Sequence, residues 1–242
     1  QLTDFVNSSR WDLLSQTKIS NANASRYIEF FETARNFGIE NIWIIDKITN
    51  IVVNYGYVIR IGRGASAGEL KEHLHIEEEY GRKKYKVFVR ETEGKGLLIR
   101  LREDTFKKVF QGMPTEEDRY ILLHSLAHAL LRRAPLITGL EEDTFTYQIL
   151  PNENSIIISE TRKVEESGLE YLVKKRLSDW LYTSYDLVKR CRYGCKGRNK
   201  ACPSCLFIRD ELCRCYFGGS YTPNGLLSRE FLLKLWGDVE WI

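Results

Sequence analysis

The chain has 242 residues, of which 43% are hydrophobic and 12% aromatic, which is enough for one large core or two modest ones. Its formal net charge of +3 is too small by itself to indicate a polyanionic partner. The sequence contains neither an apolar run long enough to span a membrane nor a signal-peptide pattern, so we expect a cytoplasmic protein with no membrane association.

The N-terminal portion, residues 1–97, is predicted to contain one helix and then a β-rich region. The sequence begins with Gln1 rather than Met and reads as mid-protein sequence, so we expect a fragment or a processed product. Apolar residues recur at helical spacing from Tyr27 to Phe37, and Gly38 follows as a cap. Strands are predicted over 42–48 and 50–61, and residues 62–84 are predicted to form an exposed excursion.

The C-terminal portion, residues 98–242, is predicted to be mainly helical. Residues 85–89 and 97–101 are expected to pair as a hairpin around Gly94–Gly96, before a short helix over 106–110. A long helix begins after Thr115 and ends before Pro135. A strand over 155–159 and a helix over 168–190 follow. The sequence therefore predicts an α+β fold, in which a β-rich N-terminal portion packs with a helical C-terminal portion stapled by a cysteine-type zinc site.

The six cysteines of the chain all lie between positions 191 and 215. In a reducing cytoplasm, such clustering favours a metal site over disulfides. Cys202-Pro-Ser-Cys205 is the turn on which two thiolates can meet one Zn²⁺. The preferred ligand set is Cys195, Cys202, Cys205 and Cys213, with Cys191 and Cys215 as alternates. A shell of four thiolates leaves no position for water, so this zinc is predicted to be structural.

Two alternatives to zinc remain open at the cysteine cluster. An iron–sulfur cluster also uses four thiolates, and ligand count alone does not separate the two centres. Disulfides are the second alternative, since intracellular proteins of hyperthermophiles are rich in them.

A basic run passes through the cysteine cluster and contains no acidic residue. It can follow a phosphate backbone on a metal-rigidified loop, with Tyr193 interleaved, or it can be a solvated basic surface. Its members are Lys189, Arg190, Arg192, Lys196, Arg198 and Lys200.

Four stretches resemble a known family: Leu123–Ala134 (LHSLAHALLRRA), Ile156–Thr161 (IIISET), Ala201–Leu206 (ACPSCL) and Asn224–Arg229 (NGLLSR). They are similar to the zinc-binding C-terminal domain (MZB) of Mrf-type superfamily 2 helicases. This domain also occurs in DrmB, the partner of the DrmA helicase in the DISARM phage-defence system. The resemblance spans residues 98–235, and the segment 48–60 resembles the strand that precedes the domain in stand-alone DrmB-like proteins.

The resemblance implies a non-enzymatic accessory module that supports a helicase on DNA in repair or phage defence. The partners it implies are a helicase subunit, or a helicase region outside this sequence, and DNA. A Walker-type phosphate-binding sequence does not occur in these residues, so any ATP-driven activity has to come from elsewhere.

Two rival functions follow from the residues themselves. His124 and His128 are spaced i, i+4 on a predicted helix, as in a metal-dependent hydrolase, but the glutamate of a zinc protease is missing between them. Structural histidines near the core are the preferred interpretation. The second rival is a protein-interaction scaffold with no contact to nucleic acid.

Overall fold

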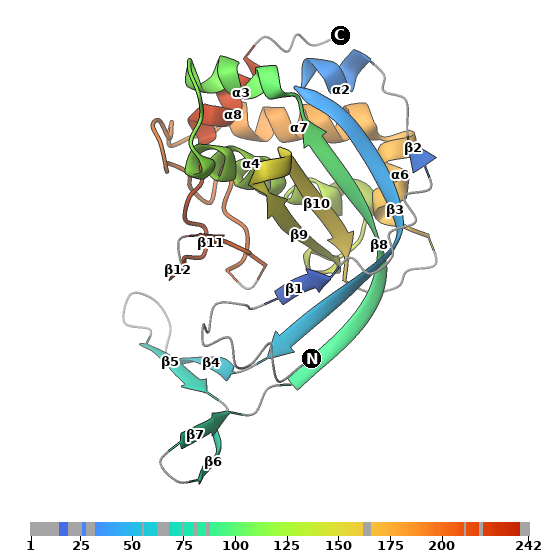
Figure 1. The fold of residues 1–242 in the computed structure, drawn as a ribbon. Coiled ribbons are helices and arrows are strands. Elements are labelled where there is room, and N and C mark those ends of the chain that lie inside the picture. The colour runs from blue at the N-terminus through green and yellow to red at the C-terminus, as the bar shows by residue number, and fades with distance from the viewer. Residues whose placement is uncertain are drawn as a thin grey trace.

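The computed structural model describes residues 15–18, 26–27, 32–54, 56–61, 68–73, 75–79, 82–85, 88–161, 166–210, 212–217 and 220–237. Within these residues the α+β class is confirmed: an antiparallel sheet is covered by helices (Figure 1). None of the described helices is long and apolar enough to cross a membrane.

The main sheet is built around two long strands, β3 (Ile39–Asn54) and β8 (Phe88–Leu101), which pair antiparallel along their lengths. β10 (Ser155–Glu160) pairs with β8, and β9 (Phe145–Leu150) pairs with β10. On the other side of β3, both β1 (Ser15–Lys18) and β2 (Arg26–Tyr27) pair with it. Figure 1 shows β3 and β8 as a curved ribbon that extends beyond the shorter strands.

In the part of the chain that the structure describes, three small strand pairs lie outside the main sheet. β4 (Gly56–Ile61) pairs with β5 (Gly68–His73), and β6 (His75–Glu79) pairs with β7 (Arg82–Tyr85). β11 (Tyr216–Phe217) pairs with β12 (Ser220–Tyr221). The strands β5, β6 and β7 occupy the region that was predicted to be an exposed excursion, and they belong to strand pairs separate from the main sheet.

All of the described helices except α2 follow β8. They are α2 (Glu32–Asn36), α3 (Glu103–Phe110), α4 (Glu116–Leu131), α5 (Ala134–Thr138), α6 (Gly168–Lys175), α7 (Leu177–Lys189) and α8 (Arg229–Trp236), with short 3-10 turns at Glu142–Thr144 and Pro151–Glu153.

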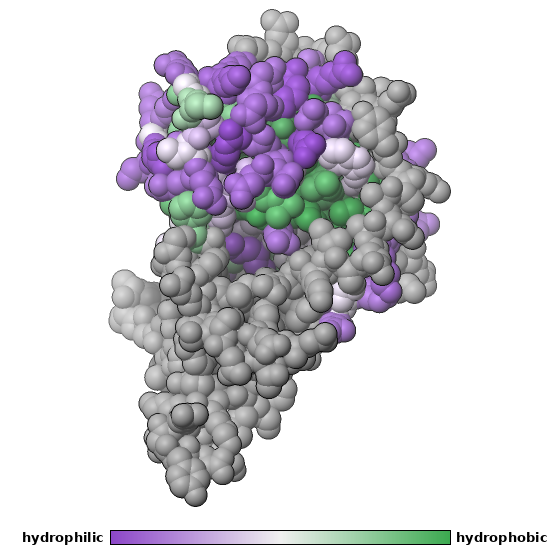
Figure 2. Space-filling view, in the orientation of Figure 1, coloured by the Kyte–Doolittle hydropathy of each residue, from purple (hydrophilic) through white to green (hydrophobic). Residues whose placement is uncertain are grey.

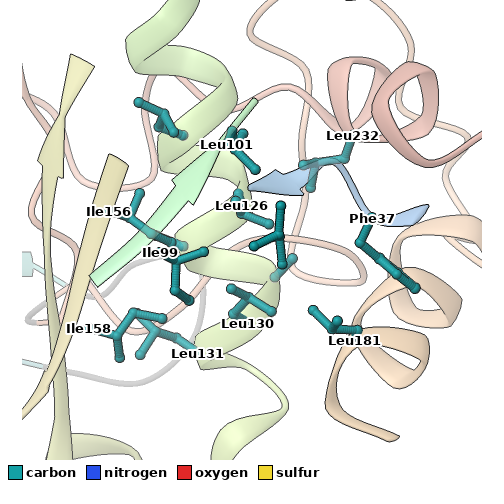
Figure 3. Packing of buried hydrophobic residues seen from close by; sticks show 14 of the residues in the cluster. Phe37, Ile99, Leu101, Leu126, Leu130, Leu131, Ile156, Ile158, Leu181 and Leu232 are labelled. Carbon is teal, nitrogen blue, oxygen red and sulfur yellow. The ribbon is translucent and has the colours of Figure 1, made fainter. Parts of the chain in front are cut away.

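Helix α4 is the centre of the molecule. It begins with a capping box, in which the Thr115 hydroxyl accepts the main-chain N–H of Asp118 and the Asp118 carboxylate accepts that of Thr115. From Tyr120 to Leu131 every residue is buried. A helix buried all round needs apolar partners on both sides. Figure 3 shows these partners, with Ile99, Ile156 and Ile158 of the sheet on one side of α4 and Leu181 and Leu232 of other helices on the other.

Two glycines of β8 were predicted to form a turn, and that prediction is wrong. β8 continues straight through Gly94 and Gly96, and the register places Gly94 opposite Ile48 and Gly96 opposite Ile45. A β-carbon at Gly94 would overlap the carbonyl oxygen of Glu160, and one at Gly96 would overlap the side chain of Ile48. These glycines therefore serve close packing, because any side chain would push the neighbouring chain away.

Three further boundaries differ from the predictions. Tyr27 belongs to the strand β2, and the first helix is described only over α2, because residues 28–31 lie outside the described residues. The helix predicted over 168–190 is divided at Arg176, whose backbone leaves helical geometry between α6 and α7. β3 is one strand with a register shift between Ile45 and Ile48 where two strands were predicted.

The boundary predicted between residues 97 and 98 falls inside β8. Leu97 and Ile99, on either side of it, belong to the same hydrophobic core, which also contains Phe37 and Trp236. The two portions of the chain thus share one core. On the face drawn in Figure 2, hydrophilic residues cover the upper part of the described surface and a hydrophobic band lies below them.

Candidate metal centre

Four cysteines that follow α7 form a compact cluster: Cys191, Cys195, Cys202 and Cys205. The Cys202 sulfur lies 3.6 Å from that of Cys191 and 3.7 Å from that of Cys205, and the Cys191 and Cys195 sulfurs are 4.0 Å apart. All four Sγ atoms lie within 4.8 Å of one another. Cys191 and Cys205 are buried, whereas Cys195 and Cys202 are half-buried.

Local backbone geometry brings these cysteines together. α7 ends at Lys189, and the chain then reverses through Gly194, Gly197 and Asn199, whose φ angles are +57°, +100° and +59°. Left-handed conformations of this kind favour glycine and asparagine. At the Cys-Pro-Ser-Cys turn, the Cys205 N–H donates to the Cys202 carbonyl at 3.0 Å, and the Cys202 N–H donates to the Cys205 sulfur at 3.3 Å.

Arg229 holds the beginning of the segment that carries the four clustered cysteines, residues 190–207, which is named the cysteine loop. Although it is a charged residue, it is buried, and its guanidinium donates to the carbonyl oxygens of Val188, Lys189 and Cys195 at 2.6, 3.1 and 3.1 Å. Two of these carbonyls close the C-terminal turn of α7, where a cation is favoured by the helix dipole. This role was not predicted, because a single arginine in an apolar stretch carries no burial pattern.

Two other arginines hold the loop against α4. Arg132, at the C-terminal end of α4, donates to the carbonyl oxygens of Pro203 and Phe207, the latter at 2.8 Å. Arg198 pairs with Glu117 and Asp118 at the N-terminal end of the same helix, with N–O distances of 2.9 and 2.7 Å. The loop therefore contacts both ends of α4.

The donor set fits zinc. Four thiolates bound to Zn²⁺ at about 2.3 Å in a tetrahedron lie about 3.8 Å apart, and the cluster is close to that spacing before any metal is considered. Burial and, to a smaller extent, the neighbouring Cys202 and Cys191 sulfurs together raise the pKa of the Cys195 thiol to about 11. Thiolates packed so closely repel one another, and a divalent cation among them removes that repulsion. Zinc held by Cys191, Cys195, Cys202 and Cys205 would cross-link the loop and would have no open coordination position.

The preferred sequence-based ligand set differs from this cluster at one position. Cys213 was placed in the set and Cys191 among the alternates, but the structure brings Cys191 to Cys195, Cys202 and Cys205. Cys213 lies instead beside His124 and His128, and Cys215 is buried near Cys213. The Asn224 side chain holds the intervening chain, since its amide accepts the Ile208 N–H at 3.0 Å and donates to the Ile208 carbonyl at 2.8 Å.

All six residues of the basic run are exposed, but they are not equivalent. Arg198 pairs with α4, and Arg190 pairs with Asp186 one turn back at 2.6 Å. The Lys189 ammonium lies over the ring of Tyr185. Among the described residues, Arg192, Lys196 and Lys200 have no ion-pair partner, and Tyr193 between them is 76% exposed. These three residues and Tyr193 are named the loop patch here.

The two histidines of α4 do not form an open site. His124 and His128 are both fully buried, and the group they form with Cys213 contains no carboxylate among the described residues. A hydrolase needs a general base and access for substrate and water. The geometry described here gives the hydrolase hypothesis no support.

Comparison with known protein families finds a match that includes most of the cysteine loop. Residues 126–206 match the model of the MrfA Zn-binding domain (MZB), a stretch that contains all four clustered cysteines. Zinc is thus the metal to which both the family and the donor set point. No curated protein matches the chain.

One solved structure similar to this chain is that of the DUF1998 helicase MrfA bound to DNA. It aligns with 81% of this chain at 13% identity and a TM-score of 0.45. A score below 0.5 does not establish a common fold, so the family match on residues 126–206 is the stronger comparison. The chain covers 22% of the length of that helicase.

Proposed function

We propose that this chain is a non-enzymatic, zinc-stapled accessory module that supports a superfamily 2 helicase on DNA, in repair or phage defence. The observation that carries the proposal is the loop patch. The loop patch lies on the cysteine loop, inside the segment that matches the MrfA Zn-binding domain. A helicase subunit, or a helicase region outside this sequence, is the proposed partner, and the cytoplasm is the proposed location.

The proposed contact with DNA rests on the charges that the fold leaves available. Arg198 and Arg190 are engaged in ion pairs within the protein, so their charges are largely compensated. Arg192, Lys196 and Lys200 face solvent, and Tyr193 offers a ring on which a base can stack. The zinc holds this loop in one conformation, which lowers the entropic cost of ordering it on DNA.

Retention of DNA at low salt tests this proposal. The triple variant Arg192→Gln, Lys196→Gln, Lys200→Gln should bind single- and double-stranded DNA at least about tenfold more weakly, and the salt slope should flatten by up to about three charges. Arg198 is left unchanged, because its removal would also disturb the N-terminal end of α4.

The matched control neutralises three exposed cations on other elements: Arg35→Gln, Lys107→Gln and Lys175→Gln. It has the same net charge as the loop variant, so a purely global charge effect would weaken both equally. Equal weakening, or unchanged retention by the loop variant, would support the rival reading as a protein-interaction scaffold. Both variants are compared with the parent at equal zinc content.

The assignment to the DrmB-like branch is part of the same proposal. It is supported by the resemblance of residues 48–60 to the strand upstream of the domain in DrmB-like proteins. Purification of the native complex tests it, because co-purification with a separate helicase subunit is expected for that branch. A helicase motor on the same polypeptide would contradict it.

A further inference from the structure

A second group of metal-binding side chains lies apart from the four cysteines. His124 and His128 project from one face of α4, with ring centroids 4.3 Å apart, and Cys213 approaches them from the segment before β11. All three are buried, and their ligand atoms lie within 4.8 Å of one another. No residue of this group belongs to the four-cysteine cluster.

Main-chain carbonyls fix how both imidazoles are protonated. His124 Nδ1 lies 3.1 Å from the Leu226 carbonyl oxygen, and His128 Nδ1 lies 2.9 Å from that of Leu206. A carbonyl can only accept, so each Nδ1 carries the proton and each Nε2 keeps a free lone pair. Metal-binding histidines are usually oriented by such a hydrogen bond from the other ring nitrogen. Burial lowers the pKa of His124 to about 4, which keeps its ring neutral at physiological pH.

Both lone pairs converge on the hydroxyl of Tyr147. Its oxygen lies 2.8 Å from His124 Nε2 and 2.8 Å from His128 Nε2. The same oxygen accepts the Arg214 main-chain N–H at 2.8 Å. A phenol has one proton, so it can satisfy only one of the two imidazoles. Hydrogen bonds from Tyr147 alone therefore leave one buried acceptor without a donor.

Cys213 lies beside both the His124 imidazole and the Tyr147 hydroxyl. Its sulfur lies 3.6 Å from His124 Nε2 and 3.6 Å from the Tyr147 oxygen, and it accepts the Asn224 N–H at 3.1 Å. Around a tetrahedral zinc with bonds of about 2.0 Å to nitrogen and about 2.3 Å to sulfur, those two ligand atoms lie about 3.5 Å apart. The sulfur is thus positioned as a ligand.

We propose that His124, His128 and Cys213 bind a second zinc ion, with the Tyr147 oxygen as the fourth ligand once it moves from its hydrogen-bond distance of 2.8 Å to the spacing of about 3.3 Å that tetrahedral ligands need. The ion accepts both imidazole lone pairs at once, which the single phenol proton cannot do. The four groups come from α4, β9 and the segment after the cysteine loop, so the ion would join three parts of the chain. Since the group is buried, this second zinc is structural. The inference is independent of DNA binding.

The competing arrangement needs no metal. The Tyr147 O–H would donate to His128, and a Cys213 S–H would donate to His124 across 3.6 Å. A thiol is a weak donor, but this network leaves no acceptor without a partner. The two arrangements differ in the number of zinc ions bound per chain.

Metal counting by mass spectrometry on the purified full chain distinguishes them. We expect two zinc ions per chain in the parent, one in Cys213→Ser, and two in the control Cys215→Ser, whose sulfur is also buried but lies outside the group. One zinc in the parent overturns the proposal. So does retention of both ions by folded Cys213→Ser.

A second measurement avoids the risk that Cys213→Ser does not fold. X-ray absorption at the zinc edge of the parent protein reports the average ligand shell. Two sites would give fewer than four sulfur ligands per zinc, together with nitrogen or oxygen at about 2.0–2.1 Å. A shell of sulfur alone would overturn the proposal.

Discussion

The guanidinium of Arg229 donates to the carbonyl oxygen of Val188 at 2.6 Å, and thereby joins the start of α8 to the end of α7. Replacing Arg229 with Met removes this bond and those to Lys189 and Cys195 while keeping most of the apolar stem. Because buried carbonyls would lose a charged donor, we expect unfolding by urea to require about 2–3 kcal/mol less free energy.

Arg190→Gln is the control for Arg229→Met. Arg190 follows the C-terminal turn of α7 that Arg229 contacts, but its side chain is 77% exposed, and Asp186 is its ion-pair partner among the described residues. Its loss should cost no more than about 1 kcal/mol. Equal destabilisation by the two substitutions would show that Arg229 does not anchor the loop.

Loss of a zinc ligand should open the cysteine loop to trypsin. Cys202→Ser removes one thiolate from the four-cysteine cluster, and the loop then loses the cross-link that holds its turns. Arg192, Lys196 and Lys200 provide cleavage sites on the exposed side. We expect faster cleavage between positions 192 and 200 and one zinc ion fewer per chain. Cys215→Ser should be cleaved at the parental rate, and a Cys202→Ser loop that resists trypsin would contradict the structural role of the metal.

Glu170 in α6 is expected to make the free energy of unfolding depend on pH in the acidic range. Hydrogen bonds from Lys174 and Lys95 lower the pKa of its carboxyl from its ordinary value of 4.5 to about 2. A lowered pKa in the folded state contributes stability above pH 4.5, and this contribution disappears as the pH falls towards 2. Lys95→Met should therefore lower stability by about 1 kcal/mol or less at pH 7, since the pair is partly exposed.

The difference between the parent and Lys95→Met should shrink as the pH falls, because protonated Glu170 has no charge for Lys95 to stabilise. Urea unfolding at several pH values measures it. A difference that stays constant between pH 7 and pH 2.5 would mean that Lys95 acts through packing alone. Lys175→Met, an exposed lysine of the same helix, is the control.

The glycine of β8 that faces Glu160 should not tolerate a methyl group. A β-carbon at Gly94 would overlap the Glu160 carbonyl, which is a main-chain atom and cannot rotate away. We expect Gly94→Ala to destabilise the fold by about 1–3 kcal/mol in thermal or urea unfolding. Gly112→Ala is the control, since its β-carbon would meet only one atom, at 4.0 Å. Similar stability of both variants would contradict the close packing of these strands.

Local patterns in the sequence were sufficient for several elements. The start of the helix α4 after Thr115 and the strand at 155–159 could be predicted because each depends on neighbours a few residues away. Cys202 and Cys205 could be predicted as ligand candidates for the same reason. The sequence could not show whether Gly94 and Gly96 form a turn or a close contact, because the contact involves residues far away along the chain.

The choice between Cys191 and Cys213 also depended on distant contacts. Both cysteines have similar spacing from the central Cys-Pro-Ser-Cys turn. The two cysteines differ in their tertiary contacts. Hydrogen bonds between Asn224 and Ile208 hold the chain that leads to Cys213, and the two histidines of α4 lie beside Cys213.

The strand β9 was not predicted, although Phe145, Tyr147 and Ile149 alternate with Thr146 and Gln148 in the pattern of a half-buried strand. Its pairing with β10 depends on contacts between strands, which the sequence of β9 alone does not show.

The contacts of Arg198 and Arg132 with the two ends of α4 have a mechanical consequence. A helix of 16 residues is about 24 Å long, and the cysteine loop grips it at both termini. A force on the exposed lysines of this loop would therefore act on both ends of the helix. Under the proposed function, bound DNA would exert such a force through the loop patch.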